Sequence, residues 1–396
     1  MGHLHMRLGD SHNFGRRVVR RGAWVHKPRP LLWEWLLLSK TSPLRKLLSQ
    51  QARRDRLDDD AFGFLPALRF VQHGAATGGK VERIRLSPLP ALDAHGRRAL
   101  AVIVGRSIAL WSWLGVSDLH WENLVLGLDA RKRIVFGPLD IEMILADLSL
   151  PTETKLLPDA DPEYAALCRH ACGVRRVLPH VGKPIHADDL LAMAGAYRTT
   201  LDFLDRHARA IAHVLTNSTP LRETPIRVCL RSTGDYVRTD TEALWPPLLE
   251  AEAEQLARGD IPYFFRLYGR AGIRWYTNRT LTQHKRLPLH GDVPHLDPLL
   301  SIARGLRAPS RTTLREEGLL VLLAAFDHPS LSGHHATDEL DVTLRARSIV
   351  VKLPDGDELR SPRNLSAHVG SVYLPCTCGE VRSVFVPPVT ACDAPT

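Results

Sequence analysis

An aspartate and an asparagine stand five positions apart between Gly115 and Gly127, and a second aspartate follows shortly afterwards. Asp118 and Asn123 have the side-chain types and spacing used in phosphoryl transfer, where an aspartate orients a substrate hydroxyl and accepts its proton. In such sites the asparagine and a later aspartate, here Asp140, bind magnesium over the nucleotide phosphates. The pattern predicts phosphoryl transfer from ATP with Mg²⁺.

The surrounding chain has the pattern needed to position these groups. Residues 98–114 form a largely apolar helical run that ends at Gly115, a residue suited to ending a helix. Two short apolar runs then flank a turn at residues 127–132, which predicts a β-hairpin. We therefore expect the hairpin to return Asp140 to the side of Asn123.

Each of these residues also has an ordinary structural explanation. Asp118 could cap a turn, His120 could lie in a core and Asp140 could be a surface acid. The order of helix, loop and hairpin around all three favours the phosphoryl-transfer interpretation, which is a hypothesis that needs the predicted structural context.

Composition limits the class of protein and its partners. The 396 residues are 44% hydrophobic, which is enough for a globular protein with a substantial core. A formal charge of +9 favours anionic partners such as nucleotide phosphates or acidic peptides. Basic residues are not interleaved with aromatic ones as in a base-stacking surface, so nucleic acid is not an expected partner.

The sequence has no signal-peptide pattern, and its apolar segment at residues 31–38 is too short to span a membrane and contains Glu34. We expect a cytoplasmic protein without a membrane span. The cysteines form neither a dense disulfide framework nor a paired zinc motif, and reduced thiols are expected at these positions: Cys168, Cys172, Cys229, Cys376, Cys378 and Cys392.

Residues 1–92 are predicted to form a small β-rich region. Strand-like runs on both sides of Arg21-Gly22 predict a hairpin that ends near Lys27, whose ammonium group could hold phosphates. Helices are expected at residues 31–38 and 43–56, separated at Ser42-Pro43.

Residues 93–300 are predicted to be mainly helical, with long helices at 187–215 and 241–258. Arg227 and Arg231 would face one side if their segment were helical, and could then meet one phosphate; a basic solvent face is the alternative. Residues 301–396 are an extension of unassigned role. In it we expect a helix after Thr313 and strands at 340–351, 369–374 and 381–386.

Several of these segments together resemble the dehydratase domain of the class II lanthipeptide synthetases. The chain contains pieces similar to the family's Asp-x-His, Lys-Pro-Arg, Asp-x-His-x-Glu-Asn, Asp-Leu-Glu, Arg-x-x-x-Arg-x-Thr and Asp-Ile-Pro-Tyr-Phe elements, in the family's order. These pieces begin at Asp10, Lys27, Asp118, Asp140, Arg227 and Asp260.

The resemblance implies an α+β fold with a protein-kinase-like two-lobe core, a small β-rich lobe and a mainly helical lobe, followed by an α/β extension. It also implies phosphorylation of Ser or Thr in a ribosomally made precursor peptide, then loss of phosphate to give dehydroalanine or dehydrobutyrine. For phosphorylation, Asp118 and His120 are the expected catalytic groups, Asn123 and Asp140 hold Mg²⁺, and Lys27 and Arg29 bind the ATP phosphates.

For elimination, the resemblance points to Asp10, His12, Arg227 and Thr233. A guanidinium group matches phosphate oxygens, and an imidazole suits proton transfer near neutral pH. The residue that removes the α-proton stays open between His12, Lys27 and another group, and His12 has the alternative of a structural turn histidine beside Asp10.

The sequence also departs from the family pattern. The helical stretch that precedes these motifs and the zinc-dependent cyclase that follows them are missing, so we expect a separate cyclase or other subunit as partner. His26 stands where the family usually has Tyr. The competing hypotheses are a peptide Ser/Thr kinase without lyase activity and a non-catalytic scaffold that binds a leader peptide or a partner subunit.

Overall fold

The protein has a mixed α+β fold, as predicted. The structure, a computed structural model, describes residues 6–57, 60–71, 78–146, 148, 150–158, 172–182, 184–217, 221, 223–230, 236, 248–268, 270–287, 314–326, 329–338, 340–354, 356–362, 372–375 and 381–384. Across these ranges the chain forms eight α-helices and several antiparallel sheets. No helix within them is both long enough and apolar enough to cross a membrane.

The first sheet is built entirely from the N-terminal region. Its five antiparallel strands have the order β1-β2-β3-β5-β4. The predicted hairpin is confirmed, with a left-handed Gly22 (φ +59°) in the turn between β2 and β3. The strands are β1 (Met6–His12), β2 (Arg16–Arg21), β3 (Trp24–Lys27), β4 (Phe70–Val71) and β5 (Gly79–Glu82).

Two helices follow this hairpin, close to their predicted bounds. α1 (Leu32–Leu38) buries nearly all of its side chains, including Glu34. α2 (Pro43–Arg54) begins where the Ser42-Pro43 pattern predicts, because the Ser42 hydroxyl accepts a hydrogen bond from the Arg45 amide (3.1 Å).

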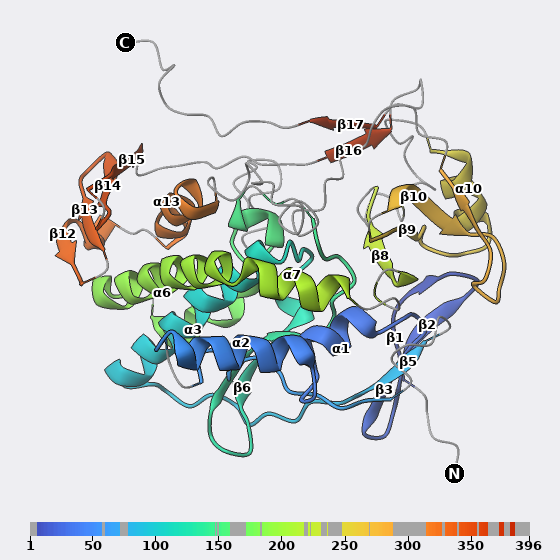
Figure 1. Ribbon diagram of the computed structural model, residues 1–396, viewed down its shortest axis with the longest axis horizontal. Helices are drawn as coiled ribbons and strands as arrows, with labels where there is room; N and C mark the ends of the chain where they lie inside the picture. Colours follow the sequence, from blue (N-terminus) through green and yellow to red (C-terminus); the bar gives the residue numbers. More distant parts are fainter. Residues whose placement is uncertain are drawn as a thin grey trace.

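Two 20-residue helices lie side by side at the centre of the molecule (Figure 1). α3 (Ala94–Trp113) begins after the capping Asp93 and includes all but the last residue of the predicted run 98–114. It approaches α6 (Ala187–Arg206) closely at Gly105, where an added Cβ would lie 2.1 Å from the Met193 carbonyl oxygen. A larger residue at position 105 would force these helices apart.

The long helix predicted at 187–215 is divided in two. α6 ends at Arg206, and α7 (Ala208–Thr216) begins after His207. The Asp55 carboxylate, just beyond α2, accepts a hydrogen bond from Arg206 and lies 2.9 Å from His207 Nε2. Periodicity alone continues through this junction, whereas the contact with Asp55 is tertiary.

Asp55→Asn is expected to lower the free energy of unfolding at neutral pH by roughly 1 kcal/mol, because it weakens these hydrogen bonds. The His207 hydrogen bond lowers the pKa of Asp55 below 3.8. A lowered carboxyl pKa stabilises the fold above its unfolded value, and this contribution is lost as pH falls through the folded value. Urea unfolding of both proteins should therefore differ at pH 7 and converge as pH falls through the folded pKa of Asp55. The control Asp338→Asn, at an exposed position outside the helices, should change little at either pH.

A second antiparallel sheet lies in the region expected to be mainly helical. Its order is β11-β10-β9-β8, formed by β8 (Pro225–Val228), β9 (Phe264–Leu267), β10 (Arg270–Tyr276) and β11 (His284–Arg286). Arg227 is thus on a strand, so the condition of a helical segment is not met at Arg227. Arg231 and Thr233 lie outside the described residues. In the region of the predicted helix 241–258, the described residues form α10 (Glu250–Ala257). Residues 241–247 lie outside the described residues.

The second sheet is covered on both faces, because successive strand residues point to opposite sides. Phe264 packs in a cluster with Ala251 of α10. Phe265 belongs to another cluster, and Phe14, in the turn between β1 and β2, packs against that cluster. The β1–β2 hairpin therefore lies against the second sheet, as the right side of Figure 1 shows.

The C-terminal region contributes one helix and two further sheets. α13 (Glu317–Ala325) lies near α6, and β12 (Gly333–Ala336), β13 (Asp341–Leu344), β14 (Ser348–Lys352) and β15 (Glu358–Pro362) form a meander beside it (Figure 1). β16 (Val372–Pro375) pairs with β17 (Val381–Val384). β13, β14, β16 and β17 agree with the predicted strand regions, whereas β12 and β15 were not predicted. Thr313 lies outside the described residues.

Candidate active site

The hairpin predicted after the Asp118 loop is present and brings Asn123 next to Asp140. β6 (Leu124–Leu128) pairs with β7 (Ile134–Pro138) in antiparallel register. The pairing extends one step further, because the Leu139 amide donates to the Asn123 carbonyl (2.8 Å). Asp140 therefore follows directly after the residue bonded to Asn123.

The Asp118 loop is held in an unusual backbone conformation. α3 ends before Gly115 (φ +62°), where an added Cβ would lie 2.0 Å from the Ala146 carbonyl oxygen. Asp118 itself has φ +65°, which is uncommon for a residue other than glycine but tolerated by Asp and Asn. Asn123 Nδ2 donates to the Asp118 carbonyl (2.8 Å) and to Asp118 Oδ2 (3.2 Å). The asparagine therefore orients the aspartate across the loop.

Lys27 and Arg29 meet Asp140 at the other side of the hairpin base. Lys27 Nζ lies 3.3 Å from Asp140 Oδ1 and donates to the Leu139 carbonyl (2.8 Å). The Arg29 guanidinium donates to Asp140 Oδ1 as well. Burial by itself would raise the pKa of Asp140. The positive charges of Arg29 and Lys27 outweigh burial and hold this pKa well below its usual range. Asp140 is therefore ionised at neutral pH.

Glu34 completes this charged group and was not among the predicted site residues. Lys27 Nζ donates to both of its carboxylate oxygens (3.0 and 3.1 Å), and Arg29 also donates to it. The Glu34 side chain is 0% exposed, which places a fully buried acid on α1. The sequence does contain a signal for this residue, because Glu34 is the single acid in the apolar run 31–38. An acid that is buried with such a run needs charged or hydrogen-bonding partners.

Glu142 connects this group to the second sheet. Its carboxylate lies 2.8 Å from Arg29 Nε and 3.4 Å from Arg227 NH1, and its carbonyl accepts from the Arg227 amide (2.9 Å). The Arg227 guanidinium also lies 5.6 Å from the centre of the Tyr263 ring. Burial opposes the charge of Arg227, yet Glu142 raises its pKa above the ordinary value, so Arg227 is a permanent cation.

Asp118 is close enough to Asp140, Glu142 and Arg227 for their charges to affect its pKa. Burial raises the pKa of Asp118, and the charges of Asp140 and Glu142 add to this effect, whereas His120 and Arg227 oppose it. About half of the Asp118 side chain is nevertheless accessible, and His120 Nε2 lies 3.8 Å from its Oδ1. An accessible carboxylate with a raised pKa suits proton acceptance from a substrate hydroxyl.

His12 comes to the same region from the end of β1. Its pKa is lowered by burial and by the charge of Arg227, and Glu142 and Asp10 act in the opposite direction. Its ring lies edge-on to Tyr263 at 5.9 Å. Asp10 is an exposed residue of the same strand.

The structure thus gathers most of the predicted site residues, which come from segments more than a hundred positions apart. Thr233 lies outside the described residues. Asp10 is exposed on β1, two positions before His12. The residues brought together are His12, Lys27, Arg29, Asp118, His120, Asn123, Asp140 and Arg227.

At the hairpin base, Asn123 and Asp140 carry oxygen atoms of the kind that magnesium binds. Nδ2 of Asn123 bonds to Asp118, which turns its carbonyl oxygen away from that residue, and Asp140 keeps 28% of its side chain accessible. Magnesium is commonly bound through one or two carboxylates together with substrate phosphates and water. In the described ranges no cluster of three or more His, Cys, Asp or Glu side chains is arranged as a metal site.

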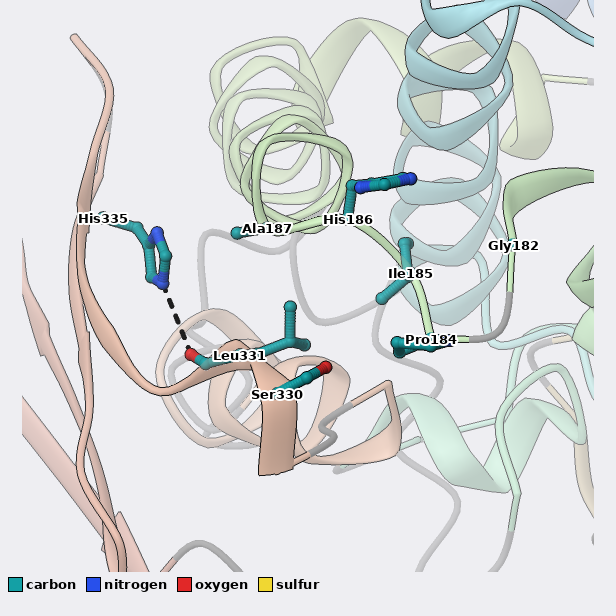
Figure 2. Close-up of a pocket in the computed structure, with 8 residues that line it drawn as sticks. All are labelled: Gly182, Pro184, Ile185, His186, Ala187, Ser330, Leu331 and His335. Atoms are coloured by element: carbon teal, nitrogen blue, oxygen red, sulfur yellow. Dashed lines mark hydrogen bonds between the residues drawn. The ribbon is translucent and has the colours of Figure 1, made fainter.

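A separate cavity of about 500 Å³ lies between the start of α6 and the segment that leads into β12 (Figure 2). It contains none of the predicted site residues, so the candidate site is defined by the charged cluster and not by this hollow. The cavity is lined by Gly182, Pro184, Ile185, His186, Ala187, Ser330, Leu331 and His335.

Glu34→Gln is expected to lower the free energy of unfolding by about 3–5 kcal/mol, because it leaves buried Lys27 and Arg29 with one partner fewer. Urea unfolding followed by circular dichroism measures the change. Glu82→Gln is the matched control, since Glu82 pairs with Arg69 at the surface and should cost less than about 1 kcal/mol. Equal losses in the two variants would contradict a structural role for the buried pair.

Comparison of the sequence with models of known protein families and with curated proteins gave no match.

Proposed function

We propose that this protein is a peptide dehydratase. It phosphorylates Ser or Thr of a ribosomally made precursor peptide with ATP and Mg²⁺, and then eliminates phosphate to form dehydroalanine or dehydrobutyrine. The observation that carries the proposal is the convergence of Lys27, Asp118 and Asp140 with Arg227 in one charged cluster. A phosphorylation site and a phosphate-binding cation are thereby adjacent.

A kinase-like arrangement of two lobes is part of the proposal. In protein kinases a strand lysine pairs with a helix glutamate beside the metal-binding aspartate. Lys27 on β3, Glu34 on α1 and Asp140 have the same relation here. The first sheet with α1 then corresponds to the small lobe, and α3, α6 and the β6–β7 hairpin to the large lobe.

In the first step Asp118 orients the peptide hydroxyl and accepts its proton. Asn123 holds Asp118 in place through one hydrogen bond to its backbone carbonyl and one to its carboxylate. Lys27 and Arg29 neutralise phosphate charge. Asn123 and Asp140 hold Mg²⁺, which when bound supplies positive charge to the ATP phosphates. His120 stays near Asp118 and helps to keep its carboxylate ionised.

In the second step the Cα–H and Cβ–O bonds of the phosphorylated residue break, and a Cα=Cβ double bond forms. The electron pair of the Cβ–O bond leaves with phosphate, and a protein base takes the α-proton. No oxidant or reductant is needed. Arg227 is the permanent cation next to the cluster and binds the departing phosphate, since its planar group matches phosphate oxygens.

The test uses the purified chain, ATP, Mg²⁺ and the Ser/Thr-containing peptide encoded by a short open reading frame beside its gene. Mass spectrometry should detect the loss of one water for each modified residue. A persistent phosphate adduct would establish a kinase without lyase activity instead.

Nucleotide binding separates an enzyme from a non-catalytic scaffold. ATP with Mg²⁺ should raise the melting temperature, because a ligand stabilises the state that binds it. Asp140→Ala should abolish the shift, whereas Asp188→Ala, a change of an exposed acid on α6, should preserve it. A wild-type protein with no shift and an unmodified peptide would support the scaffold that binds a leader peptide or partner subunit.

A further inference from the structure

The turn that follows His12 has a strained backbone that one buried carboxylate holds. Asn13, Phe14 and Gly15 all have positive φ angles of 49°, 69° and 79°. Three successive left-handed residues, two of them not glycine, cost conformational energy that other contacts must offset. Such a turn directs successive backbone N–H groups toward one point, where an anion stabilises it.

Asp260 supplies that anion. Its side chain accepts hydrogen bonds from the Phe14 amide (2.6 Å), the Gly15 amide (2.9 Å) and the Ser11 hydroxyl (2.8 Å). Only 1% of Asp260 is exposed, and Arg258 Nε lies 3.8 Å from its Oδ2. The anchor therefore joins the end of β1 to a segment about 250 positions away in the chain.

The residue after Asp260 contacts His12 directly. The Ile261 carbonyl oxygen lies 2.8 Å from His12 Nδ1, and the Ile261 amide donates to the Ser11 carbonyl (2.8 Å). A carbonyl oxygen can only accept a hydrogen bond, so Nδ1 carries the proton. In a neutral imidazole Nε2 then has the free electron pair.

We propose that Asp260 is a positioning residue for the elimination step. By anchoring the turn it holds His12 against the Ile261 carbonyl, which selects the Nδ1–H tautomer and makes Nε2 the base that takes the α-proton. This assignment rests on the proposed dehydratase function, and it names the base within that reaction.

The neighbourhood of His12 supports this assignment. Burial and the nearby Arg227 lower the pKa of His12, which keeps the ring neutral and able to accept a proton at pH 7. Arg227 is also the group assigned to the leaving phosphate. The base and the phosphate-binding cation are thus adjacent, as removal of an α-proton next to a departing phosphate requires. Tyr263 lies against both His12 and Arg227.

Asp260→Asn is the first test. The amide keeps the size of the side chain but replaces one acceptor oxygen with a donor, which faces a backbone N–H. In the peptide assay with ATP and Mg²⁺, phosphorylation should proceed at the wild-type rate, while elimination slows by about 10–100-fold and phosphopeptide accumulates, the range typical of orienting partners. Ser11→Ala removes one of the three hydrogen bonds to Asp260 and should slow elimination by a smaller factor.

Asp188→Asn is the matched control, because Asp188 is an exposed acid on α6 and its change should leave both steps unchanged. An Asp260→Asn protein that dehydrates at the wild-type rate would overturn the proposal. Equal loss of phosphorylation and elimination would also overturn it, since that result indicates general damage to the fold.

The tautomer of His12 can be measured without activity. Nitrogen-15 NMR of histidine-labelled protein, assigned with His12→Gln, should show a protonated Nδ1 and an unprotonated Nε2. Asp260→Asn should reduce this preference. A predominant Nε2–H form in the wild-type protein would exclude the assignment even if dehydration occurs, whereas an unmodified peptide with the expected tautomer would refute the proposed function and leave Asp260 a structural anchor only.

Discussion

Asp118→Asn is expected to lower the rate of peptide phosphorylation on the order of 10²–10⁴-fold, the contribution of a well-placed general base. Dehydration should fall equally, because elimination requires the phosphorylated peptide. An amide has no basic carboxylate to accept the hydroxyl proton, although its oxygen can still accept the hydrogen bond from Asn123. Mass spectrometry of the peptide over time gives both rates.

The substitution is well suited to the backbone of this loop. Asp118 has a left-handed φ of 65°, a conformation that asparagine tolerates as readily as aspartate. The variant should therefore fold normally and keep the thermal shift with ATP and Mg²⁺. Retained phosphorylation would remove Asp118 from its assigned role, and loss of the ATP shift would indicate a nucleotide-binding role instead.

Arg227→Ala is expected to separate the two steps. Phosphorylation should continue while elimination slows on the order of 10²–10³-fold, the effect of removing one donor that stabilises developing charge. The product should be a phosphopeptide that persists over the time in which the wild-type protein forms dehydrated peptide. Mass spectrometry distinguishes these products directly.

Two further variants define the cause of such an effect. Arg227→Lys keeps the charge but loses the planar group and should recover elimination only in part. Arg209→Ala, at an exposed position on α7, should behave as the wild-type protein. Complete dehydration by Arg227→Ala would contradict the assignment, as would a parallel loss of phosphorylation, because Arg227 also pairs with Glu142.

The charges of the cluster are consistent with the proposal that both steps share one site. Lys27, Arg29 and Arg227 face three acids, Glu34, Asp140 and Glu142, in a region that is largely buried. Each cation is paired before substrate arrives, since an unpaired buried charge would be costly. In the proposed reaction, phosphate groups would interact with cations whose positions are already set, and such preorganisation favours transfer and elimination over binding alone.

Local features of the site could be predicted from the sequence because they depend on nearby residues. Gly115 after an apolar helical run indicated the helix end, and the apolar runs on both sides of residues 127–132 indicated the hairpin that places Asn123 beside Asp140. Lys27 at the end of a predicted strand is an equally local inference. Caps, turns and hairpins are set by side chains within a few positions, so spacing alone carries the information.

The tertiary structure decided what no local pattern contains. The pairing of Glu34 with Lys27, the bridge from Glu142 to Arg227 and the anchoring of the His12 turn by Asp260 join segments that approach only when sheets and helices pack. It also placed Arg227 on a strand and divided the helix at His207. The physical reason is that buried charges and strained turns are stabilised by partners distant in sequence, whose approach depends on packing of the whole core.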